Sequence, residues 1–448
     1  MTFRERLMLG CAGLLVAACA VVLLRCSVYE AAVCHWHADG ALVHMVFADN
    51  PGLQHPPEHR TIPSDEVPVD WAARYPFAEE PAPPPAPQVA GLQARLTSWQ
   101  DAARRRTAAF ADWAAGRFPL HMAAVYGRNA YEGATGWNVA HIEDPASVTQ
   151  LADGSLATFM ARRDPVSEAA AVHELAAACK AQGIPFTLVL VPWKFDRSAP
   201  EAGTLDFSNE NSDAFLAHLQ AAGVDTLDLR VMLAQEGIAQ RSLFFRTDHH
   251  WTPQAALWGA RCLLAHLAVQ TGQPAEDDAL DPAAYDEERL PAFYLGSHGG
   301  TWTTARAVPE DFPILSPQFP TALHLVIPSM DIDRRGDAGV LLDRQKLAAG
   351  SAYEAYAYGN RALITVENEA APQGLHLLLL RDSFGGAAAP FLALGTGRLD
   401  IIDPRYFPGS IRTYIAREHP DAVALLCSAI EPSLDARHLT PRSFFDFR

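Results

Sequence analysis

The hydrophobic and polar positions after residue 165 alternate in a way that predicts helices and strands in turn. Apolar side chains at helical spacing end at glycines, Gly183 and Gly223, where helices commonly stop. Each helical pattern is followed by a continuous apolar run, as in strands that are buried on both faces. The predicted order is helix 167–182, strand 186–192, helix 213–222 and strand 224–229.

The same alternation returns towards the C-terminus. It predicts strand 375–380, helix 387–394, strand 399–402, helix 410–418 and strand 422–427. Pro390 is compatible with its helix if it lies in the first turn. Helices and strands that alternate with short connections predict an α/β fold with a mostly parallel central sheet flanked by helices. Between the two blocks, a helix over 254–270 precedes an irregular stretch, 274–352, whose role the pattern leaves open.

The first residues have a different pattern. An apolar run from Leu7 to Leu24 stands at the short end of the roughly 17–25 residues that span a bilayer. Arg4 and Arg6 before it favour a cytoplasmic N-terminus. Residues 1–26 are therefore predicted to direct export, either as an uncleaved signal-anchor or as a cleaved signal peptide. A buried helix of a globular domain fits the flanking arginines poorly.

Proline is dense from Pro51 to Pro87. Proline cannot donate to a helix or a central strand and favours the extended polyproline conformation, so residues 27–87 are predicted to form a stiff tether. Helical spacing begins again at Gln88 and continues towards Gly116. The globular domain is accordingly predicted to comprise residues 88–448.

Composition narrows the class of protein. The chain is 49% hydrophobic and 19% charged, as in a protein that buries a large core. Its formal net charge of −17 argues against nucleic acid as a partner, because phosphate binding needs a basic surface. The seven cysteines show no Cys-x-x-Cys spacing, which predicts neither a zinc site nor a redox pair. Cys179, Cys262 and Cys427 lie in helical or strand patterns and are predicted to be small buried hydrophobes.

The candidate chemistry begins at Asp248-His249-His250-Trp251, just before Thr252-Pro253 opens the helix over 254–270. An acid two residues before a histidine can supply a general base and the carboxylate that orients it. In the alternative interpretations, Asp248 caps the helix, and either histidine is a buried structural residue or a metal ligand. A metal site is disfavoured, because no third ligand is near in the sequence.

Ser383 is the candidate nucleophile. It follows the strand over 375–380 and precedes a helix, which is where α/β enzymes place their chemistry. Gly385 and Gly386 would allow a tight turn, and amides at the helix start would face a developing oxyanion. A serine here can also be a simple N-cap. Together with Asp248 and His250 it would complete a Ser-His-Asp triad, in which each half-site supplies what the other lacks.

These motifs resemble those of the bacterial DHHW protein family. They are also similar to the periplasmic alginate O-acetyltransferases of the AlgJ/AlgX type, whose catalytic domain is SGNH-hydrolase-like. The resemblance covers residues 88–428, and its motifs are the segments 247–252, 293–300, 378–385 and 402–406. The order of the motifs is permuted, because in ordinary SGNH hydrolases the serine comes first and the histidine last.

The resemblance implies roles for particular residues. It selects His250 over His249 as the base, because the middle position of the Asp-x-His motif varies in these families. Asp248 and Ser383 match the acid and the nucleophile. The residues that would contact substrate are Arg405, Tyr406, His249, Trp251 and Lys194. Gly359-Asn360 is a candidate for the oxyanion block.

The function that the resemblance implies is transfer of acetyl groups to hydroxyls of a cell-surface or secreted polysaccharide. The acetyl donor would be a membrane-bound acyltransferase, and neither a cofactor nor a metal is expected. The protein would act on the periplasmic side of the inner membrane, anchored there or released after cleavage. Two alternatives stay open: a carbohydrate acetyl-esterase with the same triad, and a non-catalytic glycan-binding or scaffold subunit.

Overall fold

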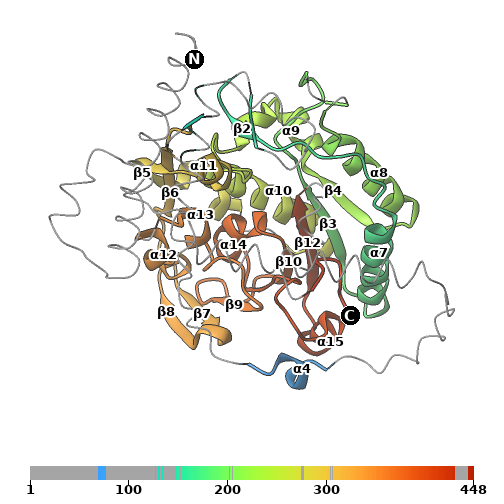
Figure 1. The fold of residues 1–448 in the computed structure, drawn as a ribbon. Coiled ribbons are helices and arrows are strands. Elements are labelled where there is room, and N and C mark those ends of the chain that lie inside the picture. The colour runs from blue at the N-terminus through green and yellow to red at the C-terminus, as the bar shows by residue number, and fades with distance from the viewer. Residues whose placement is uncertain are drawn as a thin grey trace, which may run out of the picture. The chain divides into compact units, whose positions relative to one another are not determined.

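The computed structural model in Figure 1 describes most of the chain after residue 147. The described residues are 69–76, 127, 130, 131, 134, 148–151, 153–200, 202, 203, 205–273, 277–302, 304, 306–348, 350–428 and 442–448. The predicted export segment, most of the predicted tether and the helical pattern over 88–116 lie outside them. Among the described residues, no helix has both the length and the apolar content needed to cross a membrane.

The chain divides into two compact units. One comprises Ile62–Glu79, Glu143–His298 and Pro309–Arg448, and it contains the central sheet and the candidate site. The other comprises Met1–Thr61, Glu80–Ile142 and Gly299–Val308. In this second unit, the guanidinium of Arg306 lies 3.6 Å from the ring centroid of Trp302.

The central sheet has eight strands in the order β4-β3-β12-β10-β11-β9-β7-β8. The first five are parallel to one another, and the last three are added antiparallel. The strands are β3 (Phe186–Val191), β4 (Asp225–Asp228), β7 (Leu323–Ile327), β8 (Ile332–Gly336), β9 (Ile364–Asn368), β10 (His376–Arg381), β11 (Arg398–Ile402) and β12 (Ala422–Ser428). The sequence prediction identified the five parallel strands. These five strands form one parallel block, as predicted, and the antiparallel pairings of β9, β7 and β8 make the sheet as a whole mixed.

Alternate residues of the parallel strands belong to two separate hydrophobic clusters, one on each face of the sheet. On one face, Val189, Leu379 and Leu426 pack with α10 (Pro253–Thr271) and α14 (Phe384–Leu394). On the other face, Leu188, Leu380 and Leu425 pack with helices α7 (Val166–Ala181), α8 (Ser208–Ala221) and α15 (Ile411–Glu418). Burial on both faces explains why β3, β10 and β12 are apolar at almost every position.

The observed helices agree with the predicted ones, with two differences in extent. The helix α8 begins at Ser208, five residues before the predicted start. The helix α14 begins at Phe384, so Pro390 lies inside it and not in its first turn as predicted. This early start has a local cause: the amide of Phe384 donates to a carboxylate oxygen of Asp382, 2.9 Å away, which caps the first turn.

The stretch over 274–352 contains an antiparallel pair, β5 (Tyr285–Tyr294) and β6 (Glu310–Pro317), which the pattern did not predict. Most side chains of β5 are exposed, so the strand lacks the apolar alternation of a half-buried strand. The remaining elements are short: β1 (Thr149–Gln150), β2 (Leu156–Ala157), α4 (Trp71–Arg74), α9 (Leu229–Glu236), α11 (Ser297–Trp302), α12 (Arg344–Ala348), α13 (Ala352–Ala355) and the 3₁₀ turns η3 (Gln240–Leu243), η4 (Asp277–Leu280), η5 (Pro282–Ala284), η6 (Pro328–Met330) and η7 (Ala338–Leu341).

Residues 69–76 lie in the range predicted as a tether, but they pack within the unit that contains the central sheet. Trp71 and Tyr75 are buried, with ring centroids 5.5 and 5.7 Å from that of Phe407. Tyr75 is also 4.8 Å from the ring of Tyr414 in α15. These ring contacts attach residues 69–76 to Phe407 and Tyr414.

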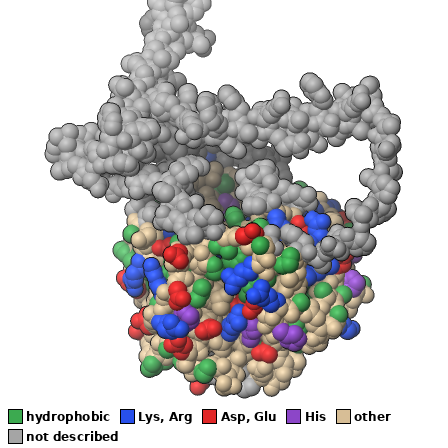
Figure 2. All heavy atoms as spheres, turned by 90° about the horizontal axis from the view of Figure 1, so that it is seen from below, with side chains coloured by type: hydrophobic (Ala, Val, Ile, Leu, Met, Phe, Trp, Pro, Cys, Tyr) green, Lys and Arg blue, Asp and Glu red, His purple; other side chains and the backbone are tan. Residues whose placement is uncertain are grey.

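The three cysteines of the described residues are buried free thiols, as predicted for Cys179, Cys262 and Cys427. Burial raises the pKa of the Cys179 and Cys262 thiols to about 12, which keeps them unreactive. On the face shown in Figure 2, acidic, basic and histidine side chains are interspersed among the described residues. Mixed charge of this kind differs from the extended basic surface that nucleic-acid binding needs.

Candidate active site

The candidate residues lie where parallel strands of the central sheet end. Ser383 follows β10, Lys194 follows β3 and Arg405 follows β11. Since the carboxyl ends of parallel strands meet at one edge of a sheet, the fold brings these segments together. The end of β12 joins them, because the amide of Ser428 donates to Asp382 Oδ2 at 2.7 Å.

Asp248 and His250 lie in a loop, residues 244–251, that we call the Asp-His loop. An antiparallel bridge between Phe244 and Trp251 closes it. The hydroxyl of Thr252 caps α10 by accepting from the amide of Ala255 at 3.3 Å. The capping role considered for Asp248 thus belongs to Thr252, and the Asp248 carboxylate makes other contacts.

The loop and the start of α14 form a chain of three polar groups. Ser383 Oγ lies 2.8 Å from His250 Nε2, and His250 Nδ1 lies 3.0 Å from Asp248 Oδ1. Ser383 occupies the N-cap position of α14, but its hydroxyl is bonded to His250 while the Asp382 carboxylate caps the helix. Nucleophile, base and orienting acid stand in the order and at the distances of a Ser-His-Asp triad.

Burial sets the protonation states of this chain. Asp248 is 1% exposed and His250 is 9% exposed. Burial lowers the pKa of His250 to about 4, and the neighbouring His249 acts in the same direction. Burial alone would raise the pKa of Asp248, but its interactions with His250 and His249 hold it well below its usual value. At neutral pH His250 is therefore neutral and Asp248 ionised, as a general base and its partner must be.

The imidazole of His250 is packed between two other rings. The His249 ring lies 3.7 Å away, centroid to centroid, and the Tyr353 ring of α13 stacks on it at 3.9 Å. His249 Nδ1 lies 3.1 Å from Asp248 Oδ1 and 2.7 Å from Ser297 Oγ. Both histidines thus face one carboxylate. This arrangement brings one ligand-type atom from each of Asp248, His249 and His250 within 4.8 Å of one another, so a third ligand-type residue is close, unlike the expectation from the sequence.

Lys194, predicted to contact substrate, lies beneath the Asp-His loop. It is 2% exposed, and its ammonium donates to the backbone carbonyls of Leu156, at 2.7 Å, and of Asp248. Burial lowers its pKa to about 8, against the attraction of Asp248 and Glu310. This position is that of a support for the acid, which differs from the substrate contact that the sequence predicted.

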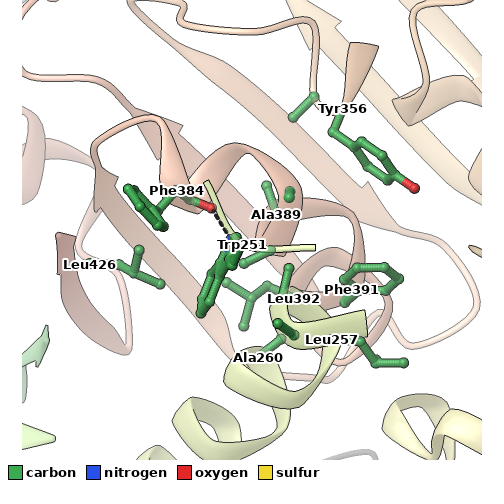
Figure 3. Close-up of a cluster of buried hydrophobic side chains, with 14 of the residues drawn as sticks. Trp251, Leu257, Ala260, Tyr356, Phe384, Ala389, Phe391, Leu392 and Leu426 are labelled. Atoms are coloured by element: carbon green, nitrogen blue, oxygen red, sulfur yellow. Dashed lines mark hydrogen bonds between the residues drawn. The ribbon is translucent and has the colours of Figure 1, made fainter. Parts of the chain in front are cut away.

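Trp251, also predicted to contact substrate, is fully buried. Figure 3 shows its indole among the hydrophobic side chains of α10 and α14, with Nε1 donating to the Phe384 carbonyl at 3.0 Å. A Cβ on Gly259 would lie 2.8 Å from this ring, so α10 needs glycine there for the indole to fit. Trp251, the residue after His250, is therefore hydrogen-bonded to Phe384, the residue after Ser383.

The loop before Ser383 is fixed by a buried arginine. Arg381 donates to Asn360 Oδ1 at 2.5 Å and to the carbonyl of Gly359, and its Nη1 lies 3.8 Å from Asp403 Oδ2. A Cβ on Gly385 would lie 2.5 Å from Cβ of Arg381. The sequence predicted that Gly385 permits a turn, but the residue is helical, and what it permits is close packing of α14 on Arg381.

Arg405 and Tyr406 lie beyond the end of β11. The Arg405 guanidinium binds both carboxylate oxygens of Asp403, at 2.9 and 2.7 Å. Burial would lower the pKa of Arg405, but this pairing raises it above its usual value, so the side chain stays charged. Attraction to Asp382, the neighbour of Ser383, contributes. Arg405 is thus a charged side chain held by Asp403, and its contact with substrate stays a prediction.

Several residues of the site were not identified from the sequence as part of it. Tyr294 and Ser297 bind the Asp248 carboxylate, and Glu310 binds the backbone of Thr247. The first two belong to the segment 293–300, one of the motifs that carry the resemblance. His298 of the same segment is neutral, because burial lowers its pKa to about 3. Arg381 lies in the motif 378–385 but was given no role, and Tyr353 lies in no motif.

Fold and site together define an α/β protein with the geometry of a Ser-His-Asp triad. Residues 232–398 match the family model described as DHHW protein. Residues 156–297 match the model of the SGNH hydrolase-like domain of the acetyltransferase AlgX. The resemblance predicted from the sequence is therefore confirmed: this chain is similar to both families, and both matched ranges include Asp248–Trp251.

Solved structures with the same fold include a DHHW family protein from Eubacterium siraeum and PatB1 from Bacillus cereus. The first is 17% identical at a TM-score of 0.51, over 63% of this chain and 90% of its own. The second is 20% identical at a TM-score of 0.54, over 67% of this chain and 100% of its own. At these identities the likeness establishes the fold. A comparison with curated proteins found no match.

Proposed function

We propose that the protein is an O-acetyltransferase that moves acetyl groups to hydroxyls of a polysaccharide. The observation that carries the proposal is the continuous hydrogen-bonded chain from Ser383 through His250 to Asp248. The similarity of residues 156–297 to the AlgX domain supports acetyl transfer as the reaction class. In this proposal the donor is a membrane-bound acyltransferase, and the protein works on the periplasmic side of the inner membrane.

The reaction has two balanced halves. Ser383 Oγ attacks the acetyl carbonyl of the donor while its proton passes to His250 Nε2; the tetrahedral intermediate then expels the donor oxygen, which takes that proton. An acceptor hydroxyl next gives its proton to His250 and attacks acetyl-Ser383. Collapse releases the new ester and returns the proton to Ser383. Asp248, ionised and bonded to His250 Nδ1, stabilises the imidazolium in both halves.

The oxyanion donors differ from those expected. The amides of Phe384, Gly385 and Gly386 at the start of α14 donate to acceptors of residues 382 and 383. The proposal instead assigns the oxyanion to the Ser383 amide and the Asn360 side chain. Arg381 donates to Asn360 Oδ1, so the Asn360 amide nitrogen is directed away from Arg381. This contact supports the sequence candidate Gly359-Asn360.

Replacing Asn360 with alanine is expected to lower kcat about 10²- to 10³-fold with little change in KM, the loss typical of one oxyanion donor. The measurement is steady-state turnover of an activated acetyl ester. Gln345→Ala, a change to an amide side chain in α12, serves as the control. An unaltered kcat in Asn360→Ala would remove Asn360 from the reaction.

The function is tested by supplying purified full-length protein with an acetyl ester, with and without an oligosaccharide, and analysing the sugar by mass spectrometry. Acetylated oligosaccharide that forms with wild type and not with Ser383→Ala supports transfer. If wild type hydrolyses the ester and forms no acetylated oligosaccharide, the protein is an esterase and the transferase assignment is overturned. Failure of wild type both to turn over ester and to react with a fluorophosphonate identifies a non-catalytic subunit and overturns both.

A further inference from the structure

We infer that Tyr294 and Ser297 are positioning residues that hold the Asp248 carboxylate ionised and aimed at His250. This inference rests on the proposed function, since it assigns a role within the same triad. Both residues belong to the stretch over 274–352, to which the sequence pattern gave no role. They act through Asp248 and not on the reacting atoms.

The contacts divide the two carboxylate oxygens between the two hydroxyls. Tyr294 donates to Asp248 Oδ2, and Ser297 donates to Oδ1 at 2.7 Å. Oδ1 also accepts from the His250 amide at 3.2 Å and faces His250 Nδ1 at 3.0 Å. With both oxygens held from the same side, rotation of the carboxyl group about its Cβ–Cγ bond would break hydrogen bonds. The oxygen that faces His250 is thus fixed.

Glycine between the two donors allows this close approach. A Cβ on Gly296 would lie 2.4 Å from Cβ of Asp248 and 2.8 Å from its Oδ2. Real Cβ atoms do not approach other atoms so closely, so a side chain at residue 296 would displace the acid. The Gly296 amide in turn donates to Thr247 Oγ1 at 3.1 Å. The segment from Tyr294 to Ser297 is therefore packed directly on the Asp-His loop.

The β5–β6 pair fixes the segment at its base. Tyr294 and Glu310 are cross-strand partners in this pair. Tyr294 binds Asp248, and Glu310 accepts from the backbone amides of Arg246, at 2.8 Å, and Thr247, at 2.6 Å. Two facing residues of one antiparallel pair thus bind consecutive parts of the Asp-His loop. This register gives the antiparallel pair a function in the site.

A buried carboxylate needs such donors. Asp248 is 1% exposed, and ionising a buried acid is costly unless hydrogen bonds or a cation stabilise the charge. The nearby cation, Lys194, is bonded to the Asp248 backbone carbonyl. Neutral hydroxyl donors stabilise the carboxylate without cancelling the negative charge that His250 needs when it becomes an imidazolium. A lysine or arginine on the carboxylate would weaken that stabilisation.

Removal of a donor has a definite sign. Asp248 then binds a proton more readily, and its less stabilised charge also favours a proton on His250. Both effects raise the pH at which the pair takes up its first proton, so the acid limb of activity moves to higher pH. Charged and titratable groups that act on this pair from the surrounding elements are His249, Lys194, His298, Tyr353 and Glu354.

The experiment measures the rate of fluorophosphonate labelling of Ser383 against pH for full-length wild type, Tyr294→Phe and Ser297→Ala. Tyr285→Phe is the matched control, because Tyr285 begins the same strand and donates to the Ala279 carbonyl. We expect each test variant to label about tenfold more slowly, with its acid limb raised by about one pH unit, the value of one hydrogen bond to a charge. Tyr285→Phe should keep the wild-type acid limb.

The outcomes separate this inference from the proposed function. Slower labelling by the same factor at every pH would show a purely structural role and overturn the inference while the triad stands. Labelling at the wild-type rate with an unmoved limb would overturn it as well. Wild type that never labels at any pH would overturn the proposed function itself. If Tyr294→Phe fails to fold, the question is decided by the acid limb of Ser297→Ala, a variant that loses only one hydroxyl group.

Discussion

Ser383→Ala is expected to lose fluorophosphonate labelling completely and to lower acetyl-ester turnover by about 10⁵- to 10⁶-fold, as removal of a triad nucleophile does in serine hydrolases. The substitution removes Oγ, the atom to which the acetyl group would be bonded. The fold should persist, because the cap of α14 is the Asp382 carboxylate and the hydroxyl of Ser383 is bonded to His250. Reaction with the fluorophosphonate, ester turnover and the thermal unfolding temperature are measured on the same preparation.

Ser316→Ala is a suitable control, since Ser316 is an exposed serine on β6. It should label and turn over as wild type does. If Ser383→Ala retained turnover within tenfold of wild type, the nucleophile would have to be another group, and the triad assignment would fail. A loss of folding, visible as a lowered Tm, would instead mark Ser383 as structural.

The second large effect separates the two adjacent histidines. His250→Ala is expected to lose about 10⁵-fold or more in kcat, because His250 Nε2 faces the nucleophile. His249→Ala should lose about tenfold, since His249 shares the carboxylate and stacks on His250 without forming the contact to Ser383. Steady-state kinetics with one acetyl ester measures both.

Each variant is the matched control of the other, because both remove an imidazole that faces Asp248 from the same loop. Equal losses in the two would contradict the assignment of His250 as the base. A larger loss in His249→Ala would reverse it. Tyr353→Leu adds a third comparison: it removes the ring stacked on His250 and should leave the hydrogen bonds of His250 to Ser383 and Asp248 in place.

The parallel half of the fold follows from the sequence because burial on both faces imposes a pattern that can be seen locally. The strands β3, β10 and β12 are apolar at almost every position. The strands β8 and β5 carry mostly exposed side chains, so their hydrophobic pattern is absent and pairing with a neighbour forms them. This is why β8 and β5 were not predicted. The strands β7 and β9 do alternate between buried and less buried positions, so their pattern is present in the sequence and was missed.

The site shows the same division. Chemistry restricts a base, an acid and a nucleophile to few residue types, so Asp248, His250 and Ser383 could be selected without coordinates. The roles of Trp251 and Lys194 depend on the direction in which each side chain points. Trp251 faces the core and Lys194 faces the backbone of the loop, and nothing in their local sequence distinguishes these directions from a substrate-facing one.

The two cross-links between the Asp-His loop and α14 have a consequence for biosynthesis. His250–Ser383 and Trp251–Phe384 both join residues 133 positions apart. A ribosome adding about 5–20 residues per second needs roughly 7 to 27 s to cover that interval. The Asp382 carboxylate accepts its hydrogen bond from the Ser428 amide only after β12, the last strand in the sequence, has been made. A nascent chain therefore carries an acid and a base without a nucleophile while those 133 residues are added, and it gains reactivity only as its last strand docks.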